Sequence, residues 1–126
     1  MNTEKASARS HQPVIRGVVT YRIRADGCLV GEWIAEVDGD TDGQLGHEFA
    51  TPLNSEDVSG GIAGTYHVEL RNRPGKQVYD GELRIERVGP SYRLFWRSPE
   101  ASQGNFDGVG ILSGVELHAA YWRGTT

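Results

Sequence analysis

Three consecutive segments between Gly64 and Trp96 constrain the fold more than any other part of the chain. In each of them large apolar residues alternate with polar ones, as Tyr66, Val68 and Leu70 do in the first. A period of two is typical of β-strands that have one buried and one solvent-facing side. Turn-forming glycine and proline pairs separate the segments, so the sequence predicts three strands joined by short turns.

The same alternation continues on both sides of these segments. We expect residues 1–13, which are polar and aperiodic, to form a flexible tail, and residues 14–126 to form one domain. Residues 51–61 are rich in turn formers and are predicted to link two halves of this domain. Together with the three central segments, five more strands are predicted at residues 18–24, 28–37, 45–50, 105–111 and 115–123.

The connections between these eight segments are too short for helical crossovers, which predicts an antiparallel, all-β fold. A faint repeat of about sixty residues relates Tyr21-Arg-Ile-Arg to Leu83-Arg-Ile-Glu. Closing eight strands into an up-and-down barrel leaves no exposed sheet edge, so we expect an eight-stranded antiparallel barrel. A two-sheet sandwich is the alternative.

Composition excludes several classes of partner. The chain has 126 residues and a formal net charge of −4, with acidic and basic residues interleaved. No basic surface is therefore expected for nucleic acid or for an anionic membrane. The single cysteine, Cys28, has no partner for a disulfide, and no segment is long and apolar enough for a signal peptide or a membrane span. We expect a cytoplasmic protein.

Several motifs resemble the streptavidin and avidin family. Residues 25–33, Ala-Asp-Gly-Cys-Leu-Val-Gly-Glu-Trp, are similar to that family's second hairpin, and residues 92–96 are similar to its W-x-V-x-W strand. Phe106-Asp-Gly108 is similar to its W-S-G step. The match covers most of residues 18–122 and is nearer still to small bacterial proteins of the same barrel type. The resemblance implies a streptavidin-like, calycin-like barrel that binds a small ligand.

The resemblance does not carry over the groups that hold biotin. In one alignment Trp33 and Ala35 stand where the family has a tyrosine and a serine. A second alignment, which starts the match at Ile62, places Val68 at the family's asparagine. Only Trp96 matches a ligand-stacking tryptophan of the family. We therefore expect a ligand other than biotin.

Large aromatic residues dominate the inward faces of the predicted strands. Eight strands enclose a space that side chains can just fill or that can hold one small ligand. A filled core is one reading, and an aromatic pocket at one mouth of the barrel is the other. The candidate ligand-binding residues are Trp33, Tyr66, Tyr79, Trp96, Phe106 and Tyr121.

Metal and catalytic sites have weak support in the sequence. His47 and Glu48 are adjacent, so on a strand they point to opposite faces and cannot chelate one ion. Ser59 and Ser113 lie in turns rather than in a nucleophile elbow. We expect no metal and no cofactor, and the sequence favours a non-enzymatic protein over the alternative of an isomerase that works by the shape of its pocket.

Four apolar residues are predicted to point outward: Val30, Ile34, Phe95 and Trp122. We expect them to form an interface of a homodimer, or of a tetramer built from dimers. Alternatively, residues 1–17 or 51–61 cover them. Two functions remain open: a binding protein for a small apolar or aromatic ligand, or a structural, protein-interaction barrel that is filled inside and acts through its outer surface.

Overall fold

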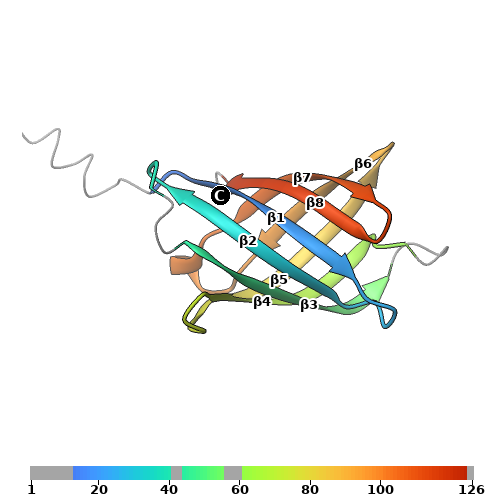
Figure 1. Ribbon diagram of the computed structural model, residues 1–126, viewed down its shortest axis with the longest axis horizontal. Helices are drawn as coiled ribbons and strands as arrows, with labels where there is room; N and C mark the ends of the chain where they lie inside the picture. Colours follow the sequence, from blue (N-terminus) through green and yellow to red (C-terminus); the bar gives the residue numbers. More distant parts are fainter. Residues whose placement is uncertain (1–12, 41–43, 56–60, 125–126) are drawn as a thin grey trace, which may run out of the picture.

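The computed structural model describes residues 13–40, 44–55 and 61–124. Within these residues eight antiparallel strands form one closed barrel, in which each strand pairs with its neighbours in sequence and β8 pairs with β1 (Figure 1). The predicted up-and-down barrel is confirmed, and the sandwich is wrong. The strands are β1 (Ile15–Ile23), β2 (Leu29–Val37), β3 (Leu45–Ser55), β4 (Gly64–Asn72), β5 (Gln77–Val88), β6 (Ser91–Arg97), β7 (Phe106–Ser113) and β8 (Glu116–Arg123).

The turns form where the sequence supplies residues that adopt positive φ. Between β1 and β2, Gly27 has a φ of 88°, and the Asp26 carboxylate accepts a hydrogen bond from the backbone N–H of Cys28. Between β4 and β5, Gly75 has a φ of 99°. Residues with a Cβ rarely adopt this conformation, so glycine fixes the places where the chain reverses.

The predicted link at residues 51–61 is partly wrong. β3 continues to Ser55, and its pairing with β4 shifts register between Pro52 and Asn54. Proline has no N–H to donate to a sheet and is tolerated at such an irregularity. Turn-forming composition therefore concealed the second half of a long strand. The predicted tail, apart from Pro13, lies outside the described residues.

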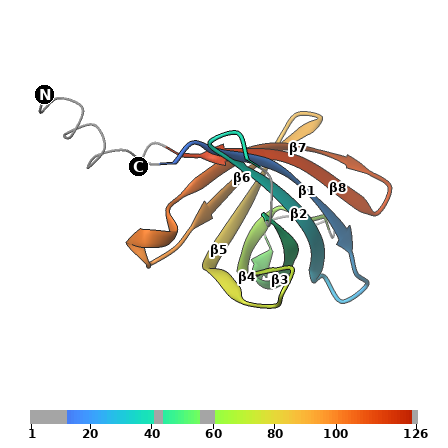
Figure 2. The same ribbon diagram turned by 60° about the vertical axis from the view of Figure 1, so that its left-hand side comes forward.

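Inward-facing side chains fill the middle of the barrel and one of its ends. Tyr21, Leu29, Val68 and Leu83 are fully buried, in agreement with the faces predicted from the alternation. The end opposite the chain's described termini is closed by Ile62, which is 5% exposed and whose carbonyl accepts a hydrogen bond from the Tyr66 hydroxyl at 2.7 Å. The other end is surrounded by the β4–β5 turn, the short 3-10 helix η1 (Ala101–Gln103) and the described chain ends (Figure 2).

Glycines inside the strands make room for aromatic rings. Tyr21 on β1 pairs with Gly31 on β2, and a Cβ at Gly31 would lie 2.8 Å from Cδ1 of the Tyr21 ring. The ring lies across Gly31 and its hydroxyl reaches Glu48 on β3, which is the cross-strand partner of Gly31. The absent side chain at Gly31 thus lets two non-adjacent strands connect inside the barrel.

We predict that Gly31→Ala destabilises the protein by about 1–3 kcal/mol, because the added methyl must displace the Tyr21 ring in a packed interior. Urea unfolding followed by tryptophan fluorescence measures the change. Glu32→Ala, on the outward side of the same strand, is the control and should stay within about 0.5 kcal/mol of the wild type. Equal stabilities of the wild type and Gly31→Ala would contradict this account of the glycine.

Candidate functional site

A pocket of about 480 Å³ opens at the end of the barrel formed by the start of β1 and the end of β8. We call it the cup. Its walls come from strand ends and from the connections around this mouth. The lining residues are Ile15, Trp33, Ala35, Val37, Gln44, Leu70, Lys76, Gln77, Val78, Tyr79, Trp96, Ser102, Gln103, Phe106, Tyr121 and Arg123.

Four aromatic rings of the cup contact one another. The ring centroids of Trp96 and Tyr121 are 5.7 Å apart, and Phe106 packs edge-on against Tyr121 at 6.1 Å and against Tyr79 at 5.9 Å. Aromatic pairs at such distances stabilise each other beyond the area that they bury. The network therefore holds one wall of the cup in a fixed shape.

The polar ends of the rings are already bonded to the backbone. The Trp33 indole N–H donates to the His47 carbonyl at 3.0 Å, the Tyr79 hydroxyl donates to Gly104 at 3.0 Å, and the Tyr121 hydroxyl donates to Ile34 at 2.9 Å. Burial raises the pKa values of both tyrosines, so they stay protonated. What these residues offer to a guest is mainly apolar ring surface.

Two more glycines allow this arrangement. A Cβ at Gly108 would lie 3.0 Å from the Trp96 ring, and a Cβ at Gly17 would lie 2.6 Å from the Tyr121 hydroxyl. Gly17 and Gly108 are both cross-strand partners of Tyr121. Rings on β6 and β8 thus lie over the neighbouring strands because those strands carry no side chain there.

A buried carboxyl group lies behind the cup. Glu48 is 2% exposed and accepts hydrogen bonds from the Tyr21 hydroxyl and, at 3.1 Å, from the Trp96 indole N–H. Burial raises its pKa from the ordinary 4.5 to about 7, although both hydrogen bonds act in the opposite direction. Desolvation therefore outweighs the two donors. Because Trp96 lines the cup while Glu48 does not, the carboxyl group positions the ring from behind.

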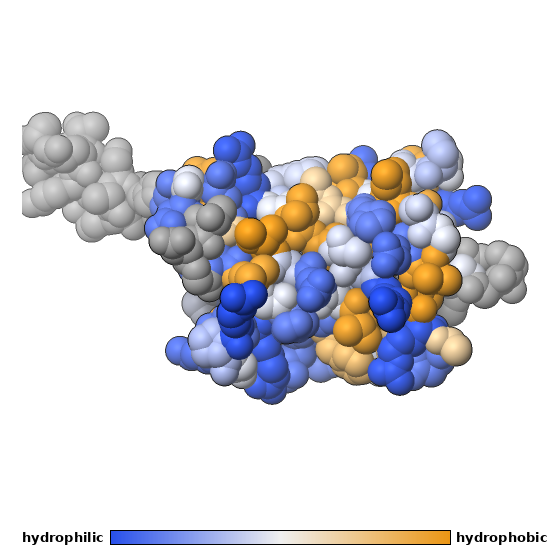
Figure 3. Space-filling model, viewed as in Figure 1, coloured by the Kyte–Doolittle hydropathy of each residue, from blue (hydrophilic) through white to orange (hydrophobic). Residues whose placement is uncertain are grey.

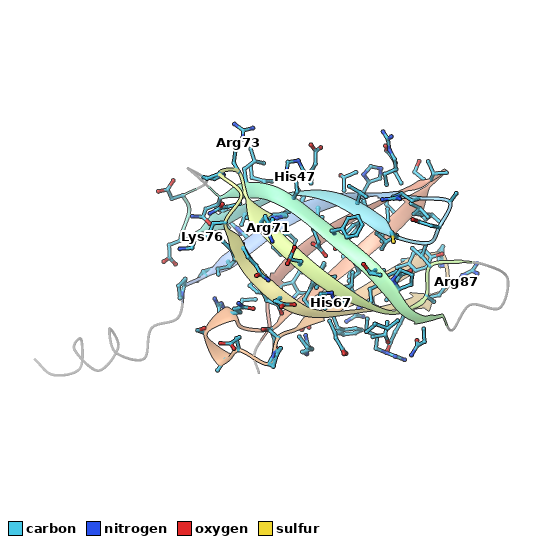
Figure 4. All side chains as sticks on the ribbon, turned by 90° about the horizontal axis from the view of Figure 1, so that it is seen from below. His47, His67, Arg71, Arg73, Lys76 and Arg87 are labelled. Atoms are coloured by element: carbon cyan, nitrogen blue, oxygen red, sulfur yellow. The ribbon has the colours of Figure 1, made fainter. Side chains whose placement is uncertain are left out.

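The rim of the cup is polar. Gln103 of η1 is fixed by its side-chain oxygen, which accepts hydrogen bonds from the Asp80 N–H and the Ser98 hydroxyl. Arg123, at the end of β8, places its guanidinium 5.5 Å from the centre of the Phe106 ring. Lys76 lies on the β4–β5 turn at this end of the barrel, and Figure 4 shows Arg87 at the opposite end.

The structure brings five of the six predicted ligand-binding residues together in the cup: Trp33, Tyr79, Trp96, Phe106 and Tyr121. The sixth, Tyr66, lies toward the closed end and hydrogen-bonds to Ile62. Alternation predicted that Tyr66 points inward, but it could not tell at which end of the barrel an inward residue lies.

Sequence reasoning missed Glu48 and Arg123. It considered Glu48 only as half of a metal pair with His47 and correctly expected the two to face opposite ways, since His47 is outside, near Glu32. The alternation of β3 gave no signal for Glu48, because the large apolar residue next to it, Phe49, is on the opposite face and is 42% exposed. Among the described residues, no three His, Cys, Asp or Glu side chains are grouped as a metal site would require.

His67 and His118, the other two histidines among the described residues, have side chains that face solvent. His67 Nε2 lies 2.7 Å from Asp80, and His118 lies 3.5 Å from Glu116. Figure 4 shows His47 and His67 on the outer side of β3 and β4. An acidic side chain thus lies beside each of the His67 and His118 imidazoles.

The outer surface carries an apolar face over β2, β1, β8 and β7. It consists of Ile34, Val18, Ala120 and Val109, which are successive cross-strand partners, together with Trp122. Figure 3 shows apolar residues in a band across β2, β1 and β8. We call this set the outer apolar face.

The four residues predicted for an interface do not form a single patch. Ile34 and Trp122 belong to the outer apolar face and line one hollow on it. Val30 is separated from Ile34 by the outward-facing Glu32. Asp107 stands between Phe95 and Trp122, and Arg97 lies over the Phe95 ring. Val18, Ala120 and Val109, which were not predicted for the interface, make up the rest of the outer apolar face.

Comparisons with protein-family models, with curated protein sequences and with solved structures found no match. The resemblance to streptavidin and avidin therefore rests on the motifs quoted above. In the part of the chain that the structure describes, no helix has the length and apolar character needed to cross a membrane.

The pKa of Glu48 predicts a pH-dependent stability. Between about pH 4.5 and 7 the folded protein keeps a proton on Glu48 that the unfolded chain releases, so the free energy of unfolding should fall as pH rises through this range. The loss contributed by Glu48 is about 3 kcal/mol. Tyr21, Tyr79 and Tyr121 would each repel an ionised Glu48 if they lost their protons. Their pKa values are raised, so they stay neutral throughout this range.

Chemical denaturation at several pH values, compared between the wild type and Glu48→Gln, measures this contribution. The amide cannot ionise, and its oxygen can still accept both hydrogen bonds, so the variant should lose the decline between about pH 4.5 and pH 7. Glu82→Gln, which removes an exposed carboxylate, should keep it. Parallel stability curves for the wild type and Glu48→Gln would contradict the buried-carboxyl account.

Proposed function

We propose that this chain is a non-enzymatic binding protein that takes a small apolar or aromatic ligand into the cup. The supporting observation is an open, preformed pocket of about 480 Å³ whose wall is a fixed aromatic network. Pockets for small molecules have volumes of roughly 300–1,000 Å³ and mostly apolar walls with a few polar groups. The cup fits this description, and it favours a binding barrel over one that is filled at both ends.

The side chains that line the cup favour ligand binding over catalysis. Among the described residues that line the cup there is no Asp, Glu or His. Glu48, the buried acid, is separated from the cup by the Trp96 ring, to which it is hydrogen-bonded. General acid–base chemistry needs a titratable group within hydrogen-bonding reach of the reacting atoms. The titratable side chains that line the cup are Lys76, at its rim, and Tyr79 and Tyr121, whose hydroxyls already donate to backbone carbonyls.

The motifs that resemble streptavidin support a ligand at the barrel mouth, but the polar groups of the cup argue against biotin. Buried ureido atoms left without partners cost about 1–3 kcal/mol each. The hydroxyls of Tyr79 and Tyr121 already donate to backbone carbonyls. Trp33 and Ala35, which line the cup, have no hydroxyl to offer.

A neutral aromatic dye tests the proposal. We predict that N-phenyl-1-naphthylamine binds with a Kd of the order of 10–100 µM, because a ligand of its size gains roughly 0.3–0.4 kcal/mol per non-hydrogen atom. Fluorescence titration measures the affinity. Ala35→Phe, which fills the cup, should weaken binding at least about tenfold, since a phenyl ring would occupy the volume that the dye needs.

The same substitution on the outer surface, Ala120→Phe, is the matched control and should leave the affinity unchanged. Thermal melts of both variants show whether they fold. Equal binding by the wild type and a folded Ala35→Phe variant would place the dye outside the cup and overturn the proposal. Calorimetry with biotin should detect no submicromolar binding.

The outer apolar face supports a second function, as an interface with another copy of the chain. Val18 is 54% exposed, Val109 42% and Trp122 39%, although an apolar side chain gains nothing from contact with water. On one side the face is bordered by Arg16 and Glu36, which form an ion pair with each other, and on the other side by Glu32. An apolar centre with a polar border is typical of an interface between two copies.

We predict that the wild type is a dimer at tens of micromolar, and that Val18→Asp makes it monomeric while it stays folded. A charge at the centre of an apolar interface loses hydration without gaining a partner. Light scattering after gel filtration measures the mass. Val30→Asp, which adds the same charge outside the face, should leave the dimer intact, and a monomeric wild type would rule this interface out.

A further inference from the structure

The charged residues of the cup are all cationic. Lys76 and Arg123 are the only charged side chains among the described residues that line it. They come from different elements, the β4–β5 turn and the end of β8. The mouth therefore presents positive charge above an apolar interior, although the chain as a whole has a net charge of −4.

Arg123 differs from the arginines on the outer surface. Its Nε is buried and has no hydrogen-bond partner in the part of the chain that the structure describes. The interaction that its guanidinium makes is with the face of Phe106. By contrast, five outer arginines pair with carboxylates: Arg16 with Glu36, Arg24 with Asp26, Arg71 with Glu69, Arg84 with Glu86 and Arg97 with Asp107.

Within the described residues no carboxylate pairs with Arg123, and its buried Nε has lost water without gaining a hydrogen-bond partner, which costs free energy. The Phe106 ring supplies only part of the compensation. The same ring restricts where the planar group lies, and close contact with Gly104 restricts it further, since a Cβ there would lie 2.5 Å from the guanidinium. Arg123 is thus held at the rim, and its Nε–H has no acceptor among the described residues.

We infer that the ligand of the cup is an apolar or aromatic carboxylate. Its ring or chain lies among the aromatic side chains, and its carboxylate lies at the rim on Arg123, with Lys76 adding positive charge from the other side of the mouth. A planar carboxylate matches the donor geometry of a guanidinium, which lysine cannot offer. The inference rests on the proposed function, because it requires that the cup binds a ligand.

A comparison of 2-naphthoate with its neutral analogue 2-naphthamide, which has nearly the same shape, separates the contribution of the carboxylate charge to the affinity from that of the aromatic ring. Calorimetry at neutral pH should give the wild type an affinity for 2-naphthoate at least about tenfold higher than for 2-naphthamide, as expected for a charge-assisted hydrogen bond. The preference should shrink as salt is added, because ions screen an attraction at the rim.

Arg123→Gln should remove the preference while 2-naphthamide binds within about twofold of its wild-type affinity. Arg93→Gln, which neutralises an exposed arginine on the outward side of β6, is the matched control and should retain the preference. If Arg123→Gln fails to fold, the ratio of the two affinities in the wild type and its salt dependence still decide the question.

The outcomes distinguish the two proposals. Equal affinities for naphthoate and naphthamide, with no change in Arg123→Gln, would overturn the carboxylate inference and leave the cup as a binding site for neutral ligands. Absence of binding by both molecules and by the neutral dye would overturn the proposed function, and the carboxylate inference with it.

Discussion

The narrow interior of an eight-stranded barrel constrains every other feature of this structure. Such an interior just accommodates its own side chains, yet this chain directs several tyrosine and tryptophan rings into it. The rings fit because neighbouring strands carry glycine where a ring must lie: Gly31 beside Tyr21, and Gly108 beside Trp96. Each ring then extends past its neighbour and makes a contact two strands away. The glycines that weaken individual strands thus permit the packing that holds the barrel together.

Glu48 is the polar exception in this interior, and it connects the packed middle of the barrel to the cup. Its carboxyl group joins Tyr21 to Trp96, and so links β1, β3 and β6 across the lumen. A buried acid with a pKa near 7 is destabilising when ionised. Its place behind a cup-lining tryptophan suggests why it is present: the orientation of Trp96, and through it the ring network, depends on a hydrogen bond made inside the barrel.

The cup forms because different residues line the two ends of the barrel. At one end Ile62 is buried and bonded to Tyr66, so the interior is closed there. At the other end the rings of Trp33, Tyr79 and Tyr121 have their polar ends bonded to the backbone, and the rim carries glutamine, lysine and arginine side chains. An apolar interior with cations at its rim is the combination from which we infer a carboxylate ligand. The outer apolar face lies on the wall of the barrel, so a second copy could bind there without closing the mouth.

The sequence alone determined the eight strands, except for the second half of β3, and the inward direction of most large apolar side chains. Period-two alternation is a local property, so it placed Trp33, Tyr79, Trp96 and Tyr121 inside, and positive-φ glycines placed the turns. The absence of crossovers and the need to protect sheet edges then made the barrel predictable. Only the tertiary structure decided which inward residues share an end, because that depends on the stagger between strands. Stagger separates Tyr66 from the cup, places Glu48 behind Trp96, and aligns Val18 with Ile34 while Val30 lies apart. The role inferred for Arg123 also depends on the tertiary structure. A local pattern cannot show that a charged side chain will be half-buried with no carboxylate paired to it among the described residues.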